Sequence, residues 1–218
     1  MSKSLIKDYL NTQGIKLPLE MVQVAYLTLG TVYNVAQVKS LPQNLWQDTK
    51  HDFDAVHVLE QSGVHNQFLR SVYAVLDTTF ERYPAKVSLF AVQPDVEGLH
   101  LNRFWHNGMN TPKQVHAGEH ENTLLHRVAQ TGWAQIIDDA QRWVNVGDMT
   151  AEESHLGLSQ MLWPLTAPSG AVLGVLYVAS PEAAAFDEDA QAWWLGAALT
   201  VADALYNVFA PLDEGLED

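Results

Sequence analysis

The chain has 218 residues, 47% of them apolar, no cysteine and a formal net charge of −14. This length predicts one globular domain with an extension, and the lack of cysteine excludes disulfides, a thiolate nucleophile and cysteine-ligated metal centres from these residues. Arg142 is the only basic residue after position 130, against fourteen acidic ones, which argues against direct nucleic-acid binding because that needs basic surface. The acidic surface is explained most simply by solubility, and docking on a basic partner protein is the alternative.

The sequence predicts neither a membrane-spanning helix nor a signal peptide. No apolar run approaches the roughly 20 residues of a membrane-spanning helix. The first residues also lack the apolar core of a signal peptide. We therefore expect a soluble, cytoplasmic protein.

The first 57 residues are predicted to form a helical extension. Residues 1–16 indicate a short helix, and a longer one begins at Leu17–Pro18, with proline in its first turn, and ends before Pro42. Residues 40–58 are predicted to form a loop anchored by Trp46 and Phe53. Apolar residues recur along the longer helix at spacings of three and four, which indicates a buried stripe. The stripe consists of Leu19, Val22, Tyr26, Leu29, Tyr33 and Ala36.

The middle of the chain alternates between helices and short strands. A polar loop is expected over 107–118, Gly132 is a helix C-cap candidate, and residues 140–157 are predicted to be a long connection with one helical turn near 151–155. In chain order the predicted elements are a helix over 58–83, strands over 86–93 and 99–106, a helix over 121–130 and a strand over 133–137.

Two adjacent strands and a long helix close the chain. The strands cover 159–165 and 171–179 and are joined by a turn at Ser169–Gly170. Gly174, inside the second strand, indicates the close approach of another backbone. Asp187 is a good N-cap for the final helix. That helix carries two apolar stripes, which predicts that it is covered on both faces, by the sheet and by a helix of this chain or of a second subunit.

Two segments, LLHRVAQTGWAQIIDD and SQMLWPL…GAVLGVLYV…FDEDA, resemble the GAF domain family in their order and spacing. The resemblance covers about residues 58–210 and implies an α+β fold. In it, an antiparallel sheet has long N- and C-terminal helices on one face and a short helix with loops on the other. Residues 1–57 are then the helical extension and 211–218 an acidic tail. Trp163 departs from the family pattern, which usually has a smaller residue before the proline.

The resemblance also implies a ligand pocket on the sheet face away from the terminal helices. Side chains alternate along a strand, so one of two sets faces the pocket, and the sequence does not decide which. One set contains Ser88, Phe90 and Phe104. The other contains Arg103, which would suit an anion. Tryptophans near the pocket could stack on a planar ligand or simply form core. The candidate ligand-binding residues are Phe90, His100, Phe104, His106, Asp138, Trp143, Ser159, Met161 and Trp163.

In GAF-like proteins the terminal helices often form a dimer, so we expect a homodimer. The alternative is that the N-terminal helices close the bundle within one chain. The expected interface residues are Leu19, Val22, Tyr26, Leu29, Leu195, Leu199 and Tyr206.

The nine histidines do not form a recognisable metal motif. His116 and His120 are four residues apart, but Gly118 argues against the helix that would align them, so we expect no metal. His65 and His126 are interpreted as surface or edge residues. Asp138 and Asp139 are neighbours at a strand end, point in opposite directions and are read as structural. No motif selects a haem ligand, and the cofactor stays unknown.

These observations favour a regulatory module over an enzyme. Some GAF-like proteins reduce free methionine sulfoxide through cysteine thiolates, and others attach bilins to cysteine, chemistry for which this chain has no residue. We therefore expect no enzyme activity. Two readings remain: a free-standing sensor of a small molecule that signals through protein contacts, or a ligand-free interaction scaffold whose pocket is filled by its own aromatic side chains, Trp163 above all.

Overall fold

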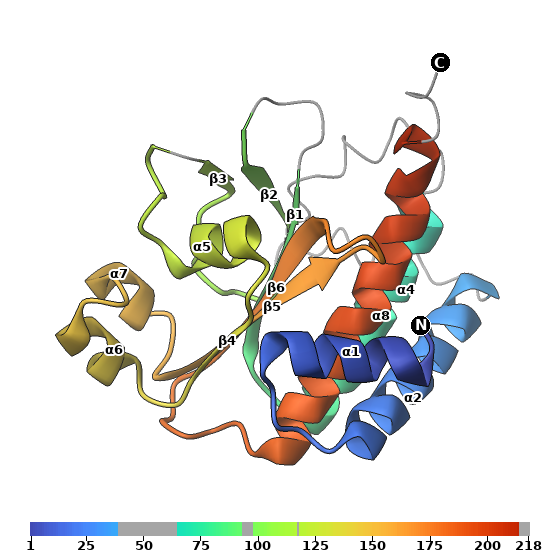
Figure 1. The fold of residues 1–218 in the computed structure, drawn as a ribbon, viewed down its shortest axis with the longest axis horizontal. Helices are drawn as coiled ribbons and strands as arrows, with labels where there is room; N and C mark the ends of the chain where they lie inside the picture. The colour runs from blue at the N-terminus through green and yellow to red at the C-terminus, as the bar shows by residue number, and fades with distance from the viewer. Residues whose placement is uncertain (39–64, 93–97, 117, 214–218) are drawn as a thin grey trace.

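The computed structural model describes residues 1–38, 65–92, 98–116 and 118–213, and their core is a six-stranded antiparallel sheet (Figure 1). The strand order is β3-β2-β1-β6-β5-β4. The expected α+β fold is confirmed. The strands are β1 (Lys86–Val92), β2 (His100–His106), β3 (Gln114–His116), β4 (Gln135–Ile137), β5 (Ser159–Thr166) and β6 (Val172–Ser180).

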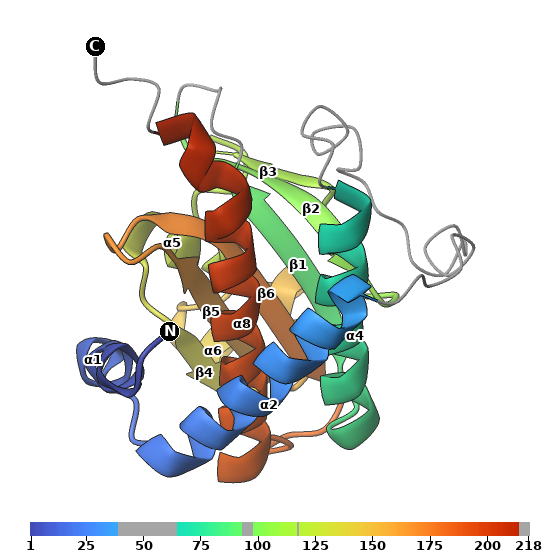
Figure 2. The same cartoon turned by 90° about the vertical axis from the view of Figure 1, so that its right-hand side faces the viewer.

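Helices cover both faces of this sheet. Figures 1 and 2 show α2, α4 and α8 on one face, which we call the bundle face, and α5 on the other, which we call the distal face. Further helices α6 and α7 lie beyond the sheet on the distal side, and no described helix is long and apolar enough to cross a membrane. The helices are α1 (Lys3–Gln13), α2 (Leu19–Val38), α4 (His65–Arg82), α5 (Leu124–Thr131), α6 (Ala140–Val146), α7 (Ala151–Ser154) and α8 (Glu188–Asp213).

Side-chain caps fix where these helices begin and end. Thr123 caps the start of α5, and Gly132, in the left-handed conformation that glycine tolerates, ends it as predicted. Asp187 accepts a hydrogen bond from the Ala190 N–H at 2.8 Å, confirming its predicted role at α8. Asp139 caps α6. The sequence predicted a connection without a helix where α6 lies and a loop where β3 lies, so both elements are corrections.

Two separate cores form on the two faces of the sheet. The bundle-face core joins α1, α2, α4 and α8 to side chains such as Leu89, Trp163 and Leu176. The distal core joins α5 to Phe90, Leu162 and other apolar side chains. Alternation along the strands produces this division. The predicted burial of α8 on two sides is confirmed, since it packs on α2 and on the sheet.

Two glycines allow backbones to approach closely. A side chain at Gly174 would overlap the carbonyl oxygen of Phe90 on β1, so the close approach predicted there is confirmed. At Gly196 of α8 a Cβ would lie 2.7 Å from the Cβ of Ala25 on α2. The α2–α8 crossing therefore depends on a residue without a side chain, and Figure 2 shows α2 lying across α8.

Candidate functional site

The distal face carries a buried polar network at its centre. The Tyr177 hydroxyl donates to Gln160 Oε1 at 2.5 Å. The Gln160 side-chain amide donates to the carbonyl oxygens of Glu153 and Gly157, both at 2.8 Å. Burial raises the pKa of the Tyr177 phenol well above its usual value, and the nearby Glu153 carboxylate adds to this shift. The side-chain amide of Gln160 and the hydroxyl of Tyr177 thus both have hydrogen-bond partners, and these bonds hold the α7 segment against β5 and β6.

Glu153 joins the beginnings of two helices. Its carboxylate accepts hydrogen bonds from the Leu124 N–H at 2.6 Å, from the Thr150 N–H at 3.2 Å and from the Thr150 hydroxyl at 2.9 Å. The side chain is 7% exposed. Helix N-termini present unpaired N–H groups and a positive dipole end, which explains how a carboxylate that has no basic partner among the described residues is stabilised here.

A second polar cluster lies at the β1–β2 end of the distal face. The Arg103 guanidinium donates to the Thr111 carbonyl oxygen at 2.6 Å, and the Ser88 and Thr111 hydroxyls are 2.8 Å apart. All three residues are buried. The sequence left open which strand set faces this side. Ser88 and Phe90 face it together with Arg103, so both sets contribute.

A β-bulge explains this mixture. Leu89 pairs with Trp105, whereas Phe90 pairs with Arg103, so one extra residue on β2 lies opposite the β1 step between them. A bulge reverses the side-chain alternation beyond it. Phe104, an expected ligand-binding residue, therefore lies in the bundle-face core, with its ring edge-on to Phe68 at 5.7 Å.

Two further expected ligand residues also lie on the bundle face. Met161 and Trp163 are fully buried there, so neither is placed on the distal face. On β5 the distal face receives Gln160 and Leu162 instead. The suggestion that Trp163 fills the pocket is thus corrected. Side chains alternate along β5, so Trp163 points to the bundle face while its neighbour Leu162 points to the distal face. Phe90 is fully buried in the distal core, on the expected face.

The other expected ligand residues are dispersed. Ser159 donates to the Glu182 carbonyl oxygen at 2.7 Å and accepts the Ala185 N–H at 3.0 Å, which is a structural role. Asp138 is exposed. Trp143 of α6 is half-buried against the distal core. His100 and His106 are half-buried at opposite ends of β2. The structure does not gather these residues around one cavity.

His126 was interpreted as a surface or edge residue, and the structure corrects this. It lies on α5, is 2% exposed, and neither ring nitrogen has a hydrogen-bond partner among the described residues. Buried polar groups normally have partners. Only its helical position, adjacent to the apolar pair Leu124 and Leu125, could have indicated its burial from the sequence. The side chain of His65 lies outside the described residues.

Most of the expected dimer residues are buried inside one chain. Val22 and Leu29 of α2 and Leu195 and Leu199 of α8 are at most 2% exposed, because α2 packs across α8 within the chain. This corrects their assignment to an intersubunit surface and agrees with the alternative that the N-terminal helices close the bundle. Leu19 and Tyr26 are half-buried, and Tyr206 is exposed.

A cleft of about 720 Å³ lies between α1, α8 and the β5–β6 turn. Its aromatic lining residues are Tyr9, Trp133 and Tyr206, and its acidic ones are Asp8 and Asp203. Trp133 is 51% exposed although it is a large apolar side chain. An open cleft with aromatic walls and a few polar groups is typical of small-molecule sites.

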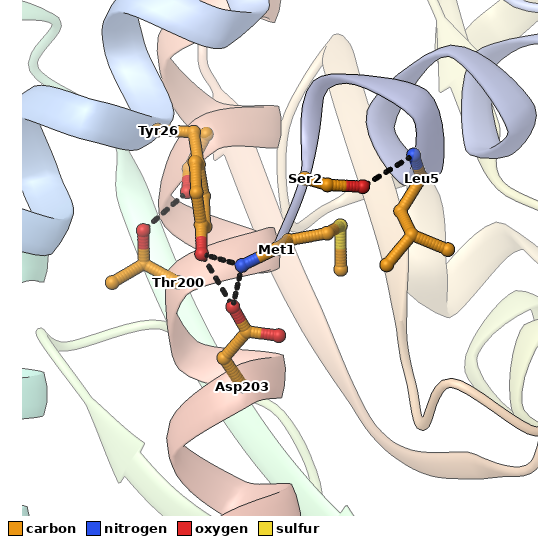
Figure 3. A network of polar contacts seen from close by, with 7 residues as sticks. Met1, Ser2, Leu5, Tyr26, Thr200 and Asp203 are labelled. Atoms are coloured by element: carbon orange, nitrogen blue, oxygen red, sulfur yellow. Dashed lines mark hydrogen bonds and ion pairs between the residues drawn. The ribbon is translucent and has the colours of Figure 1, made fainter.

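A polar network forms one end of this cleft (Figure 3). The Tyr26 hydroxyl donates to Asp203 Oδ2 at 2.5 Å, and the Met1 amino group lies 3.0 Å from the same oxygen and also contacts the Tyr26 hydroxyl. Burial is the main cause of a raised pKa for Tyr26, and the hydrogen bond to Asp203 and that carboxylate's charge add to it. The network connects Met1, which precedes α1, to α2 and α8.

Comparison with known proteins gives matches at the level of structure. No family model matches the chain, and no curated protein does. A protein of Burkholderia vietnamiensis described as a candidate GAF sensor superposes with a TM-score of 0.54 at 16% identity, covering 86% of this chain and 97% of its own. The GAF domain of an Acinetobacter phosphoenolpyruvate-protein phosphotransferase gives 0.54 at 12% identity, covering 78% and 97%.

The same comparison corrects the expectation that the chain is not an enzyme. Free methionine-R-sulfoxide reductase from Neisseria meningitidis also matches, at a TM-score of 0.46 and 19% identity, covering 72% of this chain and 94% of its own. Enzymes are thus among the structural matches, and the fold does not exclude enzyme activity. At these identities the matches establish architecture alone, and the chain has a GAF-like fold.

Proposed function

We propose that the chain is a regulatory module that acts through protein contacts of its helical layer, as a homodimer. The distal face, where the GAF resemblance implies a ligand pocket, is occupied by the chain's own side chains, including Phe90, Leu162 and Tyr177, all at most 1% exposed. This supports a role in which the helices carry the interaction.

The observation that carries the proposal is an apolar row on the outer face of α2. Val24, Leu27 and Val35 are 59%, 55% and 46% exposed. Positions three or four apart lie on one helix face, and Thr31 completes this spacing. Large apolar side chains that are grouped on a surface mark interaction sites. We call Val24, Leu27, Thr31 and Val35 the α2 row.

Charge favours a second copy of this chain as the occupant. Glu20 is the only charged residue in the twenty of α2. The chain as a whole has a net charge of −14, so most surfaces would repel their own copy. In a two-fold contact the same patch meets itself, and the uncharged α2 row does so without like-charge repulsion.

Light scattering coupled to size exclusion tests this proposal. The chain has a mass of 24.3 kDa, and we expect the dimer mass for the wild type and for Val146→Asp, a control at another exposed apolar position on α6. Leu27→Asp is expected to give the monomer mass, because two carboxylates would meet at the contact. A monomeric wild type, or a Leu27→Asp variant that stays dimeric, would contradict the homodimer.

Small-molecule sensing is a second candidate, supported by the cleft between α1 and α8. A ligand there would contact α8, which packs on α2, so binding would act on the helix that carries the α2 row. Native mass spectrometry of protein purified from cells is expected to show extra mass that Trp133→Ala loses and the control Val146→Ala retains. If the same extra mass persists in Trp133→Ala, the ligand lies elsewhere and the cleft is not its site.

A further inference from the structure

His116, Glu119 and His120 bring three potential metal ligands together after β3. Each offers one ligand atom, and these atoms all lie within 4.8 Å of one another. Both histidines are half-buried, whereas Glu119 is exposed. Two imidazoles and a carboxylate are donors that zinc accepts. The cluster is far along the sheet from the cleft at α1, at the opposite edge from β4.

The backbone holds the two histidines in place. His116 pairs with His100 across the β2–β3 ladder, and the two rings lie 5.7 Å apart. Gly118, with a φ of +93°, allows the chain to turn, and the His120 N–H then donates to the His116 carbonyl oxygen at 3.2 Å. The Thr123 N–H and hydroxyl both donate to the His120 carbonyl oxygen, at 2.9 and 2.8 Å. The sequence argument against a metal assumed that only a helix could align these side chains, but a turn does so.

The spacing of the donor atoms fits a zinc ion. Zinc binds imidazole nitrogen and carboxylate oxygen at about 2.0–2.1 Å with tetrahedral geometry, which places two ligand atoms about 3.4 Å apart. His116 Nε2 and Glu119 Oε2 are 3.3 Å apart. The ligand atoms lie within 4.8 Å of one another, so the widest separation needs to shorten by at most about 1.4 Å to reach the tetrahedral spacing. Rotation of the exposed Glu119 side chain and small rotations of the two half-buried imidazoles allow this change.

Two existing contacts of His120 would change on metal binding. His120 Nδ1 accepts the His116 N–H at 3.5 Å, which is at the outer limit for a hydrogen bond. Coordination through the His120 ring would replace or weaken this long contact and would shift the edge-on packing of the His116 and His120 rings, whose centroids lie 5.3 Å apart. The cost of rearranging the ring is therefore small.

We propose that His116, Glu119 and His120 form a site for a divalent transition-metal ion of the zinc class, with water in the fourth position. Three protein ligands with water in the fourth position are a known coordination of zinc in proteins. The ion would connect β3 to Thr123, which caps α5 over the distal face. Metal binding would thereby stiffen the cover of that face. This inference does not depend on the proposed dimer.

The test is a zinc titration of the untagged chain in competition with a chromophoric chelator. The wild type is expected to bind one Zn²⁺ more than His116→Ala and His120→Ala. Affinity at the site should fall by more than about tenfold, the loss that even an outer-shell change causes. His155→Ala removes an exposed histidine at the end of α7 and is the matched control, expected to bind as the wild type does.

A second measurement separates ligand loss from unfolding. Circular dichroism of each variant without metal is expected to match the wild type. Specificity is checked with excess Mg²⁺, which is expected not to compete with zinc because it prefers oxygen ligands in an octahedral site. Equal zinc stoichiometry and affinity in the wild type, His116→Ala and His120→Ala would overturn the proposal. So would a wild type that removes no zinc from a chelator of micromolar affinity.

Discussion

Replacing Glu153 by glutamine tests how the distal face is closed. The carboxylate accepts two backbone N–H groups, of Leu124 and Thr150, and one hydroxyl. Glutamine keeps one acceptor oxygen and places a donor NH₂ group where the other oxygen was. One backbone N–H then faces a donor, and the remaining hydrogen bond loses its charge.

The size of the effect follows from these contacts. Hydrogen bonds to charged groups contribute about 1.5–3 kcal/mol, and a buried donor left unsatisfied costs about 1–3 kcal/mol. The Thr150 hydroxyl can reorient and is not counted. We therefore expect Glu153→Gln to lower the free energy of unfolding by about 2–4 kcal/mol.

Urea unfolding followed by circular dichroism measures this difference. Glu152→Gln is the matched control, since Glu152 is the exposed neighbour on the same helix and surface substitutions usually change stability by no more than about 0.5 kcal/mol. Hydrogen exchange at the Leu124 and Thr150 amides should accelerate only in Glu153→Gln. Equal unfolding free energies for the two variants would refute the reasoning that this carboxylate stabilises both helix starts.

Three further changes probe the two cores. Gly174→Ala, whose side chain would overlap a β1 carbonyl oxygen, should destabilise by about 1–3 kcal/mol or more in urea unfolding; a neutral result would contradict the close approach. Tyr177→Phe should reduce the loss of stability above pH 10. In that range the unfolded wild type releases the Tyr177 phenol proton, whereas the folded wild type, with its raised pKa, retains it. The free energy of unfolding of the wild type therefore falls by up to about 1.4 kcal/mol per pH unit from this group. An unchanged alkaline slope would argue against that burial. Trp163→Ala should cost about 3–5 kcal/mol, whereas Trp133→Ala, at an exposed position, should cost far less; similar losses would argue against the placement of Trp163 in the bundle-face core.

Long periodic segments and capping residues could be predicted from the sequence, whereas short elements could not. The apolar stripes of α2 and α8 and the caps Gly132 and Asp187 depend on local spacing, and the structure has them where expected. The strand β3 has three residues and α6 has seven. Neither is long enough for a period to be recognised against its neighbours.

The candidate site was harder to predict because it depends on which face each strand residue occupies. The bulge opposite Leu89 and Phe90 is set by pairing between strands, and it moves Phe104 to the bundle face. Met161 and Trp163 were assigned to the wrong face for a related reason, since β5 is buried on both faces and its central residues show no alternation of polar and apolar side chains to orient it. His116 and His120 are brought close by a turn at Gly118. The sequence argument considered only a helix as a way to align them and therefore missed this turn.

The two outermost strands of the sheet, β3 and β4, have three residues each. An exposed strand edge is a template on which other chains can add, and short edges limit the number of hydrogen bonds that such an addition can form. Concentrated solutions of this protein are therefore expected to resist fibrillar growth by strand addition. Within the described part of the chain, association between copies is therefore expected to use side chains on helices or loops rather than continuation of the sheet.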